Sequence, residues 1–322
     1  MQIVIVEGDA LDISADVLVL KYAQALYGVD GLVVDRLEAA GSRVLSRLPK
    51  PGECRLVETM GQLGVPRTLF VGVVGLRAFG YEAIREFAKR ALTSLAETMP
   101  AVSHVALTLH GPGYGLDESE AFRSELAGLF DAIESRKAPS GLKRVTIVEQ
   151  SPGRVRRLQE QLTALLPAGS TAVTGHDQGA HLASHLEPLR TAGAKSQAKA
   201  HVFVAMPFAP EFDDRFHYGI QQAVNSAGYL CERADLATFT GDVITWVKER
   251  IDTASLLIAD LSTANPNVYL EVGYAWGREI PTVLWSGDAS DLRFDVKGQR
   301  CLLYKSIRAL EELLTRELKN LR

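Results

Sequence analysis

Two carboxylates in the last third of the chain, Asp260 and Glu271, have the residue types and spacing for sugar chemistry. Asp260 follows the apolar run 255–259, which is typical of a buried strand, and open α/β sheets bind ligands beyond the carboxyl ends of their strands. Asn265, followed by proline, suits the cap of a helix whose second turn contains Glu271. We therefore expect both carboxylates near one crevice, with Asn265 and Asn267 as substrate-binding amides.

Structural roles are the alternative for both carboxylates. Asp260 could cap the loop that follows it, and Glu271 could be a solvated residue on an exposed helix face. The apolar neighbours of Glu271, Leu270 and Val272, favour a buried and therefore functional carboxylate.

Cleavage of an N-glycosidic bond is the chemistry that such carboxylates favour. Breaking the bond passes through an oxocarbenium-like state, which a nearby carboxylate stabilises or traps covalently. Nicotinamide in NAD is already cationic and leaves as a neutral group, whereas a purine leaves more easily when it is protonated. No histidine is placed beside the carboxylates, and we expect structural roles for His201 and His217. This favours NAD as the substrate, although Asp260 could itself act as the acid.

Three further residues are candidates for contacting the substrate. Phe208 follows the apolar run 201–205 and could stack on a base or on nicotinamide. Arg233 and Asp235 follow the next apolar run and could meet phosphate or ribose hydroxyls. The alternatives are a core position for Phe208 and a surface ion pair for Arg233 and Asp235.

The same region resembles the TIR-like and nucleoside 2-deoxyribosyltransferase-like group of proteins. The matching segments are VFVAMPF at 202–208, CERAD at 231–235, IADLS at 258–262 and NPNVYLEVGYAWGREIPTVL at 265–284. The resemblance implies a flavodoxin-like sheet that cleaves N-glycosidic bonds in NAD, nucleosides or nucleotides. It also implies that Glu271, in the Y-x-E-x-G-Y-A pattern, is the catalytic carboxylate, together with Asp260 of the A-D-L-S pattern.

The first half of the chain carries two glycine-bearing loops between apolar runs. ALYGVDGLVVDRLEAAG spans residues 25–41, and HGPGYGLD spans 110–117. Glycines let backbone N–H groups approach a phosphate closely, and helix N-termini favour anions. Two such loops could clamp a pyrophosphate from both sides, although a glycine loop can also simply turn the chain.

Taken in order, the segments from residue 2 to about residue 133 resemble a macro domain, the ADP-ribose-binding fold. The resemblance implies an aspartate that contacts adenine and two loops that hold the phosphates. The residues concerned are Asp9, Gly28, Val29, Asp30, Gly31, Gly111, Gly113, Tyr114 and Gly115. The chain departs from the family at Lys21-Tyr22-Ala23-Gln24, where macro domains have an N-A-A-N segment. The missing asparagine argues against de-ADP-ribosylation and leaves open altered or lost nucleotide binding.

Alternating β-branched runs and helix-period segments predict an α/β fold throughout. The strands expected in the first half span 2–6, 16–20, 55–58, 68–74, 104–109 and 144–148, with helices at 31–48, 81–98, 118–135 and 153–166. The strands expected in the second half span 201–205, 229–232, 255–259, 282–285 and 301–304, with helices at 215–226, 243–253, 267–278 and 307–321.

Two domains and a linker follow from this pattern. Residues 1–166 form the expected macro-like α/β/α sensing domain, and residues 200–322 form the expected flavodoxin-like, TIR-like catalytic domain. The segment 167–199 is rich in Ala, Gly, Ser and Thr, which predicts a linker with one short helix at 180–189.

Composition limits the class of protein. The chain has 322 residues, 47% of them hydrophobic, and a net charge of −4, which is ordinary for a globular protein and gives no basic excess for a nucleic-acid partner. Three scattered cysteines favour a reducing cytoplasm, and no apolar run reaches the roughly 20 residues of a membrane helix. His176, His181 and His185 lack the glutamate of an H-E-x-x-H site, so we expect no metal.

The leading hypothesis is a sensor–effector enzyme, in which the macro-like domain binds an ADP-ribose-like signal and the TIR-like domain cleaves NAD as its substrate, without a bound cofactor. Such pairings resemble prokaryotic antiviral systems that deplete NAD. A nucleoside or nucleotide N-glycosidase or 2-deoxyribosyltransferase is the second hypothesis, and a non-enzymatic nucleotide-binding adaptor is the third.

The resemblance to TIR domains also implies an active homo-oligomer. The candidate surfaces are the loop after Trp285 and a stripe on the last helix, which would otherwise pack on its own domain. The stripe consists of Leu310, Leu313, Leu314 and Leu318.

Overall fold

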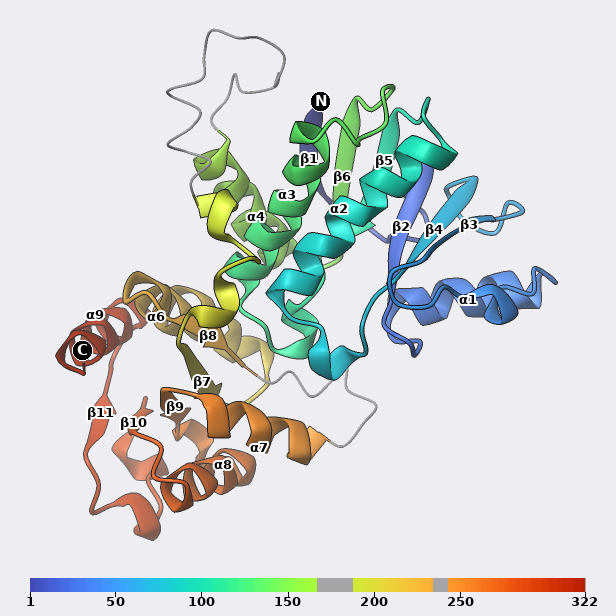
Figure 1. Cartoon of the computed structure of the whole chain (residues 1–322). Helices are drawn as coiled ribbons and strands as arrows, with labels where there is room; N and C mark the ends of the chain where they lie inside the picture. Colours follow the sequence, from blue (N-terminus) through green and yellow to red (C-terminus); the bar gives the residue numbers. More distant parts are fainter. Residues whose placement is uncertain (167–187, 234–242, 322) are drawn as a thin grey trace, which may run out of the picture. The chain divides into compact units, whose positions relative to one another are not determined.

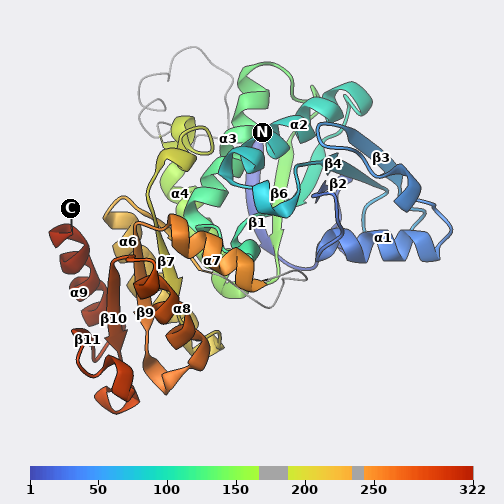
Figure 2. The same cartoon turned by 60° about the horizontal axis from the view of Figure 1, so that its bottom comes forward.

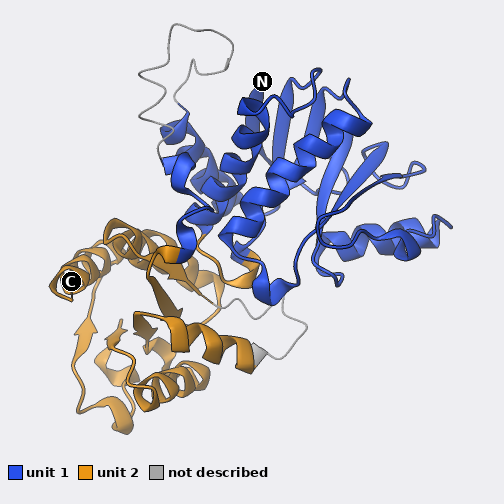
Figure 3. Ribbon diagram, in the orientation of Figure 1, with its two compact units in different colours: residues 1–112, 118–197 blue, residues 113–117, 198–322 orange. Residues whose placement is uncertain are grey.

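The computed structural model describes residues 1–166, 188–233 and 243–321, which fall into two compact units (Figure 3). Unit 1 contains residues 1–112 and 118–197, and unit 2 contains residues 113–117 and 198–322. Each unit has its own sheet, one mixed and one entirely parallel, so the expected α/β class is confirmed. No helix among the described residues is both long enough and apolar enough to cross a membrane.

Unit 1 is built on a six-stranded sheet of order β1-β6-β5-β2-β4-β3 (Figures 1 and 2). Its strands are β1 (Gln2–Glu7), β2 (Val17–Tyr22), β3 (Cys54–Glu58), β4 (Arg67–Gly72), β5 (His104–Thr108) and β6 (Arg144–Glu149). Only β3 pairs antiparallel to its neighbour. The central strand β2 is buried over five successive residues, because helices cover both faces of a parallel sheet.

The helices of unit 1 are α1 (Val29–Ala39), α2 (Tyr81–Thr98), α3 (Glu118–Glu134) and α4 (Pro152–Leu165). α2 and α3 run side by side (Figure 1), and Gly128 allows the close approach, because a Cβ there would lie 2.0 Å from the Arg85 carbonyl oxygen. α1 is shorter than the helix expected at 31–48. Gly41, with φ of 84°, ends it in a left-handed cap, and only a 3₁₀ turn, η1 (Leu45–Arg47), follows.

The described end of the predicted linker is folded against unit 1. Residues 188–191 are helical, and η4 (Ser196–Ala198) follows. The Arg85 guanidinium donates to the carbonyl oxygens of Arg190 at 2.9 Å and Ala192 at 2.6 Å while it pairs with Asp131 at 2.7 Å. The rest of the predicted linker helix, together with His176, His181 and His185, lies outside the described residues.

Unit 2 has a five-stranded parallel sheet of order β11-β10-β9-β7-β8. Its strands are β7 (His201–Ala205), β8 (Leu230–Glu232), β9 (Leu256–Asp260), β10 (Thr282–Ser286) and β11 (Cys301–Leu303). Numbered within the unit, this is the order 2-1-3-4-5 of flavodoxin-like sheets, as expected. The switch point of such a sheet lies between its first and third strands, here β7 and β9.

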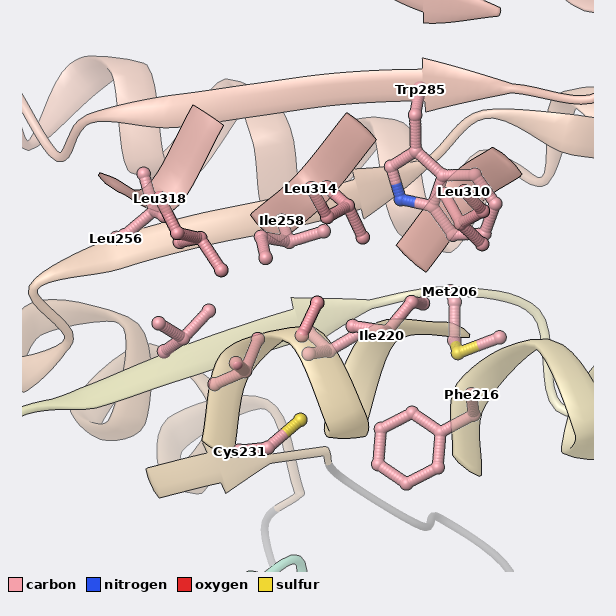
Figure 4. Close-up of a cluster of buried hydrophobic side chains, with 14 of the residues drawn as sticks. Met206, Phe216, Ile220, Cys231, Leu256, Ile258, Trp285, Leu310, Leu314 and Leu318 are labelled. Carbon is pink, nitrogen blue, oxygen red and sulfur yellow. The ribbon is translucent and has the colours of Figure 1, made fainter. Parts of the chain in front are cut away.

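Two layers of helix cover this sheet. The π-helix η6 (Arg215–Gln221), α6 (Gln222–Ser226) and α9 (Ile307–Asn320) pack on one face, and α7 (Val243–Thr253) and α8 (Pro266–Gly277) pack on the other. Leu310, Leu314 and Leu318 of α9 are fully buried in the first of these cores (Figure 4). The leucine stripe therefore packs on its own domain, and the expectation that it forms an exposed oligomer surface is wrong.

Candidate functional site

The carboxyl ends of β7 and β9 are where an open α/β sheet of this order binds ligands. β7 ends at Ala205, directly before Met206-Pro207-Phe208, and β9 ends at Asp260. The chain then turns to η6 and α6 on one face after β7, and to α8 on the other face after β9. Phe208, Asp260 and the helix that carries Glu271 thus belong to the same edge of the five-stranded sheet of unit 2, here called sheet B.

Asp260 is completely buried, with an exposed fraction of 0%. Its Oδ1 accepts a hydrogen bond from the Ser262 amide at 2.9 Å, and its Oδ2 has no hydrogen-bond partner in the described part of the chain. Burial raises the pKa of the carboxyl, while the bonds from Ser262 and the charge of Arg215 oppose the rise. One oxygen of Asp260 therefore caps the following loop, and the other has no hydrogen-bond partner among the described residues.

Two aromatic residues accompany Asp260. Trp285 lies opposite it in the β9–β10 register, and the rings of Trp285 and Tyr304 are 5.0 Å apart. The Arg215 guanidinium lies over the rings of Phe212 and Tyr304, at 4.8 and 5.8 Å from their centroids. Sequence reasoning missed Arg215, Trp285 and Tyr304, because only the strand register and a distant helix bring them to Asp260.

Glu271 lies in the second turn of α8. The Asn265 side chain caps this helix by accepting from the Asn267 amide at 2.9 Å, with proline in the first turn, as the sequence predicted. Val268, Val272 and Ala275 face the core, and Glu271 is half-buried beside them. Burial raises the pKa of its carboxyl to about 7. No described residue forms a hydrogen bond or ion pair with it, so no described residue compensates the charge of its ionised form.

The two carboxylates share a sheet edge but lie toward opposite faces. Asp260 alternates with Ile258 and pairs with Trp285, both of which lie in the core under η6, α6 and α9. α8, with Glu271, covers the other face. No hydrogen bond or ion pair between described atoms joins them. The predicted convergence of the two carboxylates near one crevice stays a prediction.

Phe208 and Arg233 are brought together as a stacked pair. The Arg233 guanidinium lies 5.1 Å from the centroid of the Phe208 ring and 4.1 Å from that of Phe216. Phe208 is 42% exposed, so it is not a core aromatic. Arg233 also approaches Asp213, with the charged atoms 3.8 Å apart. Asp235 lies outside the described residues.

The two histidines near the first strand of unit 2 have structural partners. His201 Nε2 pairs with the Arg250 carbonyl oxygen at 3.0 Å, and burial lowers the pKa of His201 to about 4. His217 Nδ1 lies 2.9 Å from Gln221 Oε1 one turn along η6. Neither contact involves Asp260 or Glu271.

The first predicted nucleotide loop belongs wholly to unit 1. Asp9 Oδ1 accepts from the Leu11 amide at 2.9 Å and so braces its own turn. Gly28 precedes α1 with φ of 61°, a conformation that favours glycine, followed by Val29, Asp30 and Gly31. Asp30 is buried and faces inward, where burial raises the pKa of its carboxyl against the opposing charge of Lys21.

A group of buried ionisable residues surrounds this loop. Lys21 is the penultimate residue of β2, with its ammonium 5.8 Å from the centroid of the Phe79 ring, and burial lowers its pKa although Asp30 opposes the shift. His110, just after β5, packs edge-on against Phe87 with ring centroids 4.7 Å apart. Where macro domains have an N-A-A-N segment, this chain therefore has a buried lysine near the end of β2, with Asp30 as its counter-charge.

The second predicted loop is divided between the units. Gly111, with φ of 112°, lies in unit 1, whereas Gly113, Tyr114 and Gly115 fall in unit 2. Within unit 2, the Gly115 carbonyl oxygen accepts from the Arg233 amide at 3.2 Å, and a Cβ on Gly115 would lie 2.5 Å from the Trp246 ring. The glycine at 115 thus permits close packing within unit 2, and the joint binding of one pyrophosphate by the two loops stays a prediction.

A surface cavity of about 630 Å³ lies elsewhere in unit 1. Its lining includes Gly52, Gly72, Glu82, Lys89 and Arg90, and none of the residues predicted to bind a nucleotide. Within the described residues, no group of three or more His, Cys, Asp or Glu side chains could hold a metal ion.

Comparison with known proteins gives a similarity of fold only. No protein-family model matches the chain, and no curated protein matches it. Among solved structures, the Trypanosoma brucei macrodomain in complex with ADP is 18% identical over 50% of this chain and 68% of that chain, with a TM-score of 0.42. The same macrodomain in complex with ADP-ribose gives 20% identity, 49% and 68% coverage and a TM-score of 0.41. The Oceanobacillus iheyensis macrodomain with ADP gives 20% identity, 50% and 90% coverage and a TM-score of 0.39.

Proposed function

We propose that unit 2 cleaves an N-glycosidic bond and that Glu271 is its catalytic carboxylate. The observation that carries this proposal is the setting of Glu271, a carboxyl half-buried at the binding edge of a flavodoxin-like sheet, with no counter-charge among the described residues. Charge that is not neutralised in the resting protein is available to a cation that develops in the transition state. Phe208, exposed and stacked on Arg233, supplies an aromatic surface for the leaving base.

The reaction needs little beyond this carboxylate when the leaving group already carries a positive charge. In NAD, the bond from the ribosyl carbon to the nicotinamide nitrogen breaks, and the nitrogen keeps the electron pair and becomes neutral. Ionised Glu271 opposes the charge left on the sugar until water adds to the carbon and releases a proton. NAD hydrolysis is therefore the leading activity, with NAD as substrate and no cofactor.

Cleavage of a nucleoside or nucleotide is the second candidate, and the pKa of Glu271 favours it. A neutral base needs a proton to leave, and a carboxyl whose pKa lies at about 7 is partly protonated at neutral pH. Protonated Glu271 would then supply the acid that no histidine supplies at this edge among the described residues. The two candidates therefore require opposite protonation states of the same side chain.

For unit 1 we propose binding of an ADP-ribose-like nucleotide at the loop that opens α1. Gly28 has a positive φ of 61° directly before α1, and a glycine loop at a helix N-terminus is a setting that favours phosphate. The macrodomains named above were solved with ADP and with ADP-ribose, but the proposal depends on this chain's own loop. The nucleotide would act as a signal that raises cleavage in unit 2, in an oligomeric effector of antiviral defence. An adaptor that binds nucleotides without cleaving them is the alternative.

The experiment is a cleavage assay with the purified full chain. NAD, adenosine and adenosine monophosphate are each incubated with and without ADP-ribose, and released nicotinamide or adenine is quantified by chromatography. Glu271→Gln is compared with Glu311→Gln, which removes a charge from α9 on the other face of the sheet. Release that survives Glu311→Gln and disappears in Glu271→Gln supports the assignment, whereas binding without release of any base supports the adaptor. Specific activity that rises with protein concentration supports the oligomer.

A further inference from the structure

The edge strand β8 of unit 2 has one side that pairs with no other strand of its sheet. β8 is the last strand in the order β11-β10-β9-β7-β8, and β7 is its neighbour. The Leu230 amide donates to the Ala200 carbonyl oxygen at 3.0 Å, on the side of β7. Because successive amides of a strand point to opposite sides, the Cys231 and Arg233 amides point to the edge. Native edge strands need cover for such groups.

Residues 113–117, which belong to unit 2, supply this cover, and we call them the strap. Asp117 Oδ2 accepts from the Cys231 amide at 2.8 Å, and the Gly115 carbonyl oxygen accepts from the Arg233 amide at 3.2 Å. Asp117 Oδ2 also accepts from Asn225 Nδ2 at 2.7 Å, which ties α6 to β8. Asp117 is only 1% exposed, so losing this acceptor would leave buried donors without a partner.

A glycine at 115 lets the strap approach unit 2 closely. Gly115 has φ of 87°, a conformation that favours glycine. A Cβ at this position would also lie 2.5 Å from the Trp246 ring and 2.9 Å from the Arg233 carbonyl oxygen. A larger residue at 115 would therefore push the strap away from Arg233.

Arg233 is the residue through which the strap acts on the proposed site. Its guanidinium lies 4.1 Å from the centroid of the Phe216 ring and 5.1 Å from that of Phe208, and its Nη1 is 3.6 Å from Met206 Sδ. Met206 and Phe208 follow β7, at the edge where sheets of this order bind ligands. The strap thus holds the backbone of a residue whose side chain lies at this edge.

We propose that Asp117 and Gly115 are positioning residues of unit 2, and that the strap holds Arg233 against Phe208 to receive the base of a substrate. The strap takes no part in breaking a bond. In the sequence it lies between β5 and α3 of unit 1, so the segment 200–322 alone would not contain it. The proposal rests on the proposed function in naming a base as the group that Phe208 and Arg233 contact.

Amide hydrogen exchange of the full chain tests the strap without any substrate. Asp117→Leu keeps the approximate size of the side chain and removes the acceptor, whereas Asp117→Asn keeps an oxygen that can accept both hydrogen bonds. We expect the Cys231 amide to exchange at least tenfold faster in Asp117→Leu than in the wild type, and within threefold of the wild type in Asp117→Asn. The amides of β11, the opposite edge strand, should not change. Unchanged exchange at Cys231 in a folded Asp117→Leu protein overturns the strap.

Kinetics with NAD separate positioning from a structural role. Asp117→Leu should raise KM about three- to tenfold and leave kcat within twofold, because contact with the base is made in both the ground state and the transition state. Asp117→Asn should keep the KM of the wild type. Asp295→Asn, at an exposed aspartate of unit 2, is the control for the lost charge. Faster exchange at Cys231 with an unchanged KM means that the strap only stabilises the fold, and overturns the positioning role.

Gly115→Ala keeps the proposal testable if Asp117→Leu does not fold. It should also raise the KM for NAD, whereas Gly61→Ala, with φ of 77° and no atom within 4 Å of its Cβ, controls for backbone strain alone. Equal KM values in the two glycine variants would overturn the role of Gly115. If the wild type releases no base from NAD, the proposed function fails, and NAD affinity measured by calorimetry replaces KM. Equal affinity in the wild type and the strap variants then overturns the positioning role.

Discussion

The two units treat buried charge in opposite ways. In unit 1, the lysine at the end of β2 faces Asp30, and each opposes the shift that burial imposes on the pKa of the other. In unit 2, Glu271 is shifted by burial alone, and one oxygen of Asp260 has no partner in the described structure. A paired charge stabilises a fixed shape, whereas an unpaired one is destabilising until a ligand arrives. This difference agrees with the proposed roles, nucleotide binding in unit 1 and bond cleavage in unit 2.

The largest effect expected from this contrast is on cleavage. Glu271→Gln keeps the shape of the side chain and removes its charge, so the oxocarbenium-like state loses its main stabilisation. We expect the rate of base release to fall more than a hundredfold, or about 3 kcal/mol in the barrier, with an unchanged circular dichroism spectrum. Normal release by a folded Glu271→Gln protein would show that the unpaired carboxyl of unit 2 is not catalytic.

The pH dependence of the wild type then distinguishes the two candidate reactions. If Glu271 acts as a carboxylate, the rate rises with pH toward a plateau above about 7, falling up to tenfold per pH unit below it. If it acts as an acid, the rate instead falls as pH rises through the same value. Initial rates with NAD and with adenosine from pH 5 to 9 decide between them. A flat profile for both substrates would contradict either role for Glu271.

We expect a loss of free energy of similar size, here in the stability of the protein, when the core that buries the leucines of α9 is disrupted. Leu314 has an exposed fraction of 0%, so Leu314→Ala should destabilise the protein by about 2 to 5 kcal/mol, measured by denaturant unfolding. Leu313, which packs only at the margin of this core, should tolerate alanine with a smaller loss. If both alanine variants lost similar amounts of stability, or if oligomer size changed without a loss of stability, the leucines of α9 would instead form an interaction surface.

The sequence predicted the elements well where pattern and local chemistry agree. The strand at 201–205 and the helices at 81–98 and 243–253 lie where the periodicity put them, and the cap at Asn265 is as predicted. The orientation of the Asp260 side chain relative to Glu271 was not predictable, because it depends on which face of the sheet the last residue of a strand points toward. The pairing of Asp260 with Trp285 depends on register, and neither register nor sheet order can be read from one chain segment.

The stability of the Glu271→Gln variant gives a smaller and independent measure of the unpaired charge. A carboxyl whose folded pKa is raised from 4.5 to about 7 contributes stability that is complete below pH 4.5 and is lost as pH rises through 7. At pH 9 the variant should therefore be more stable than the wild type by about 2 kcal/mol, allowing for the partial exposure of the side chain. The difference should shrink on going to pH 5. A variant less stable than the wild type at pH 9 would mean that Glu271 has a stabilising partner after all.

The smallest expected effect is in the loop of unit 1, where the backbone rather than a charge does the binding. Gly28 has φ of 61°, which a β-branched residue adopts only with strain, so Gly28→Val should distort the start of α1. We expect ADP-ribose to bind about tenfold more weakly, near 1.4 kcal/mol, while cleavage without ADP-ribose is unchanged. Gly41→Val is the matched control, because Gly41 also lies in unit 1 with a positive φ of 84°, at the opposite end of the same helix. Equal loss of binding in both variants would show that strain in α1, and not the loop, explains the effect. Unchanged binding in Gly28→Val would place the nucleotide elsewhere, and the 630 Å³ cavity that Lys89 and Arg90 line would be the next site to test.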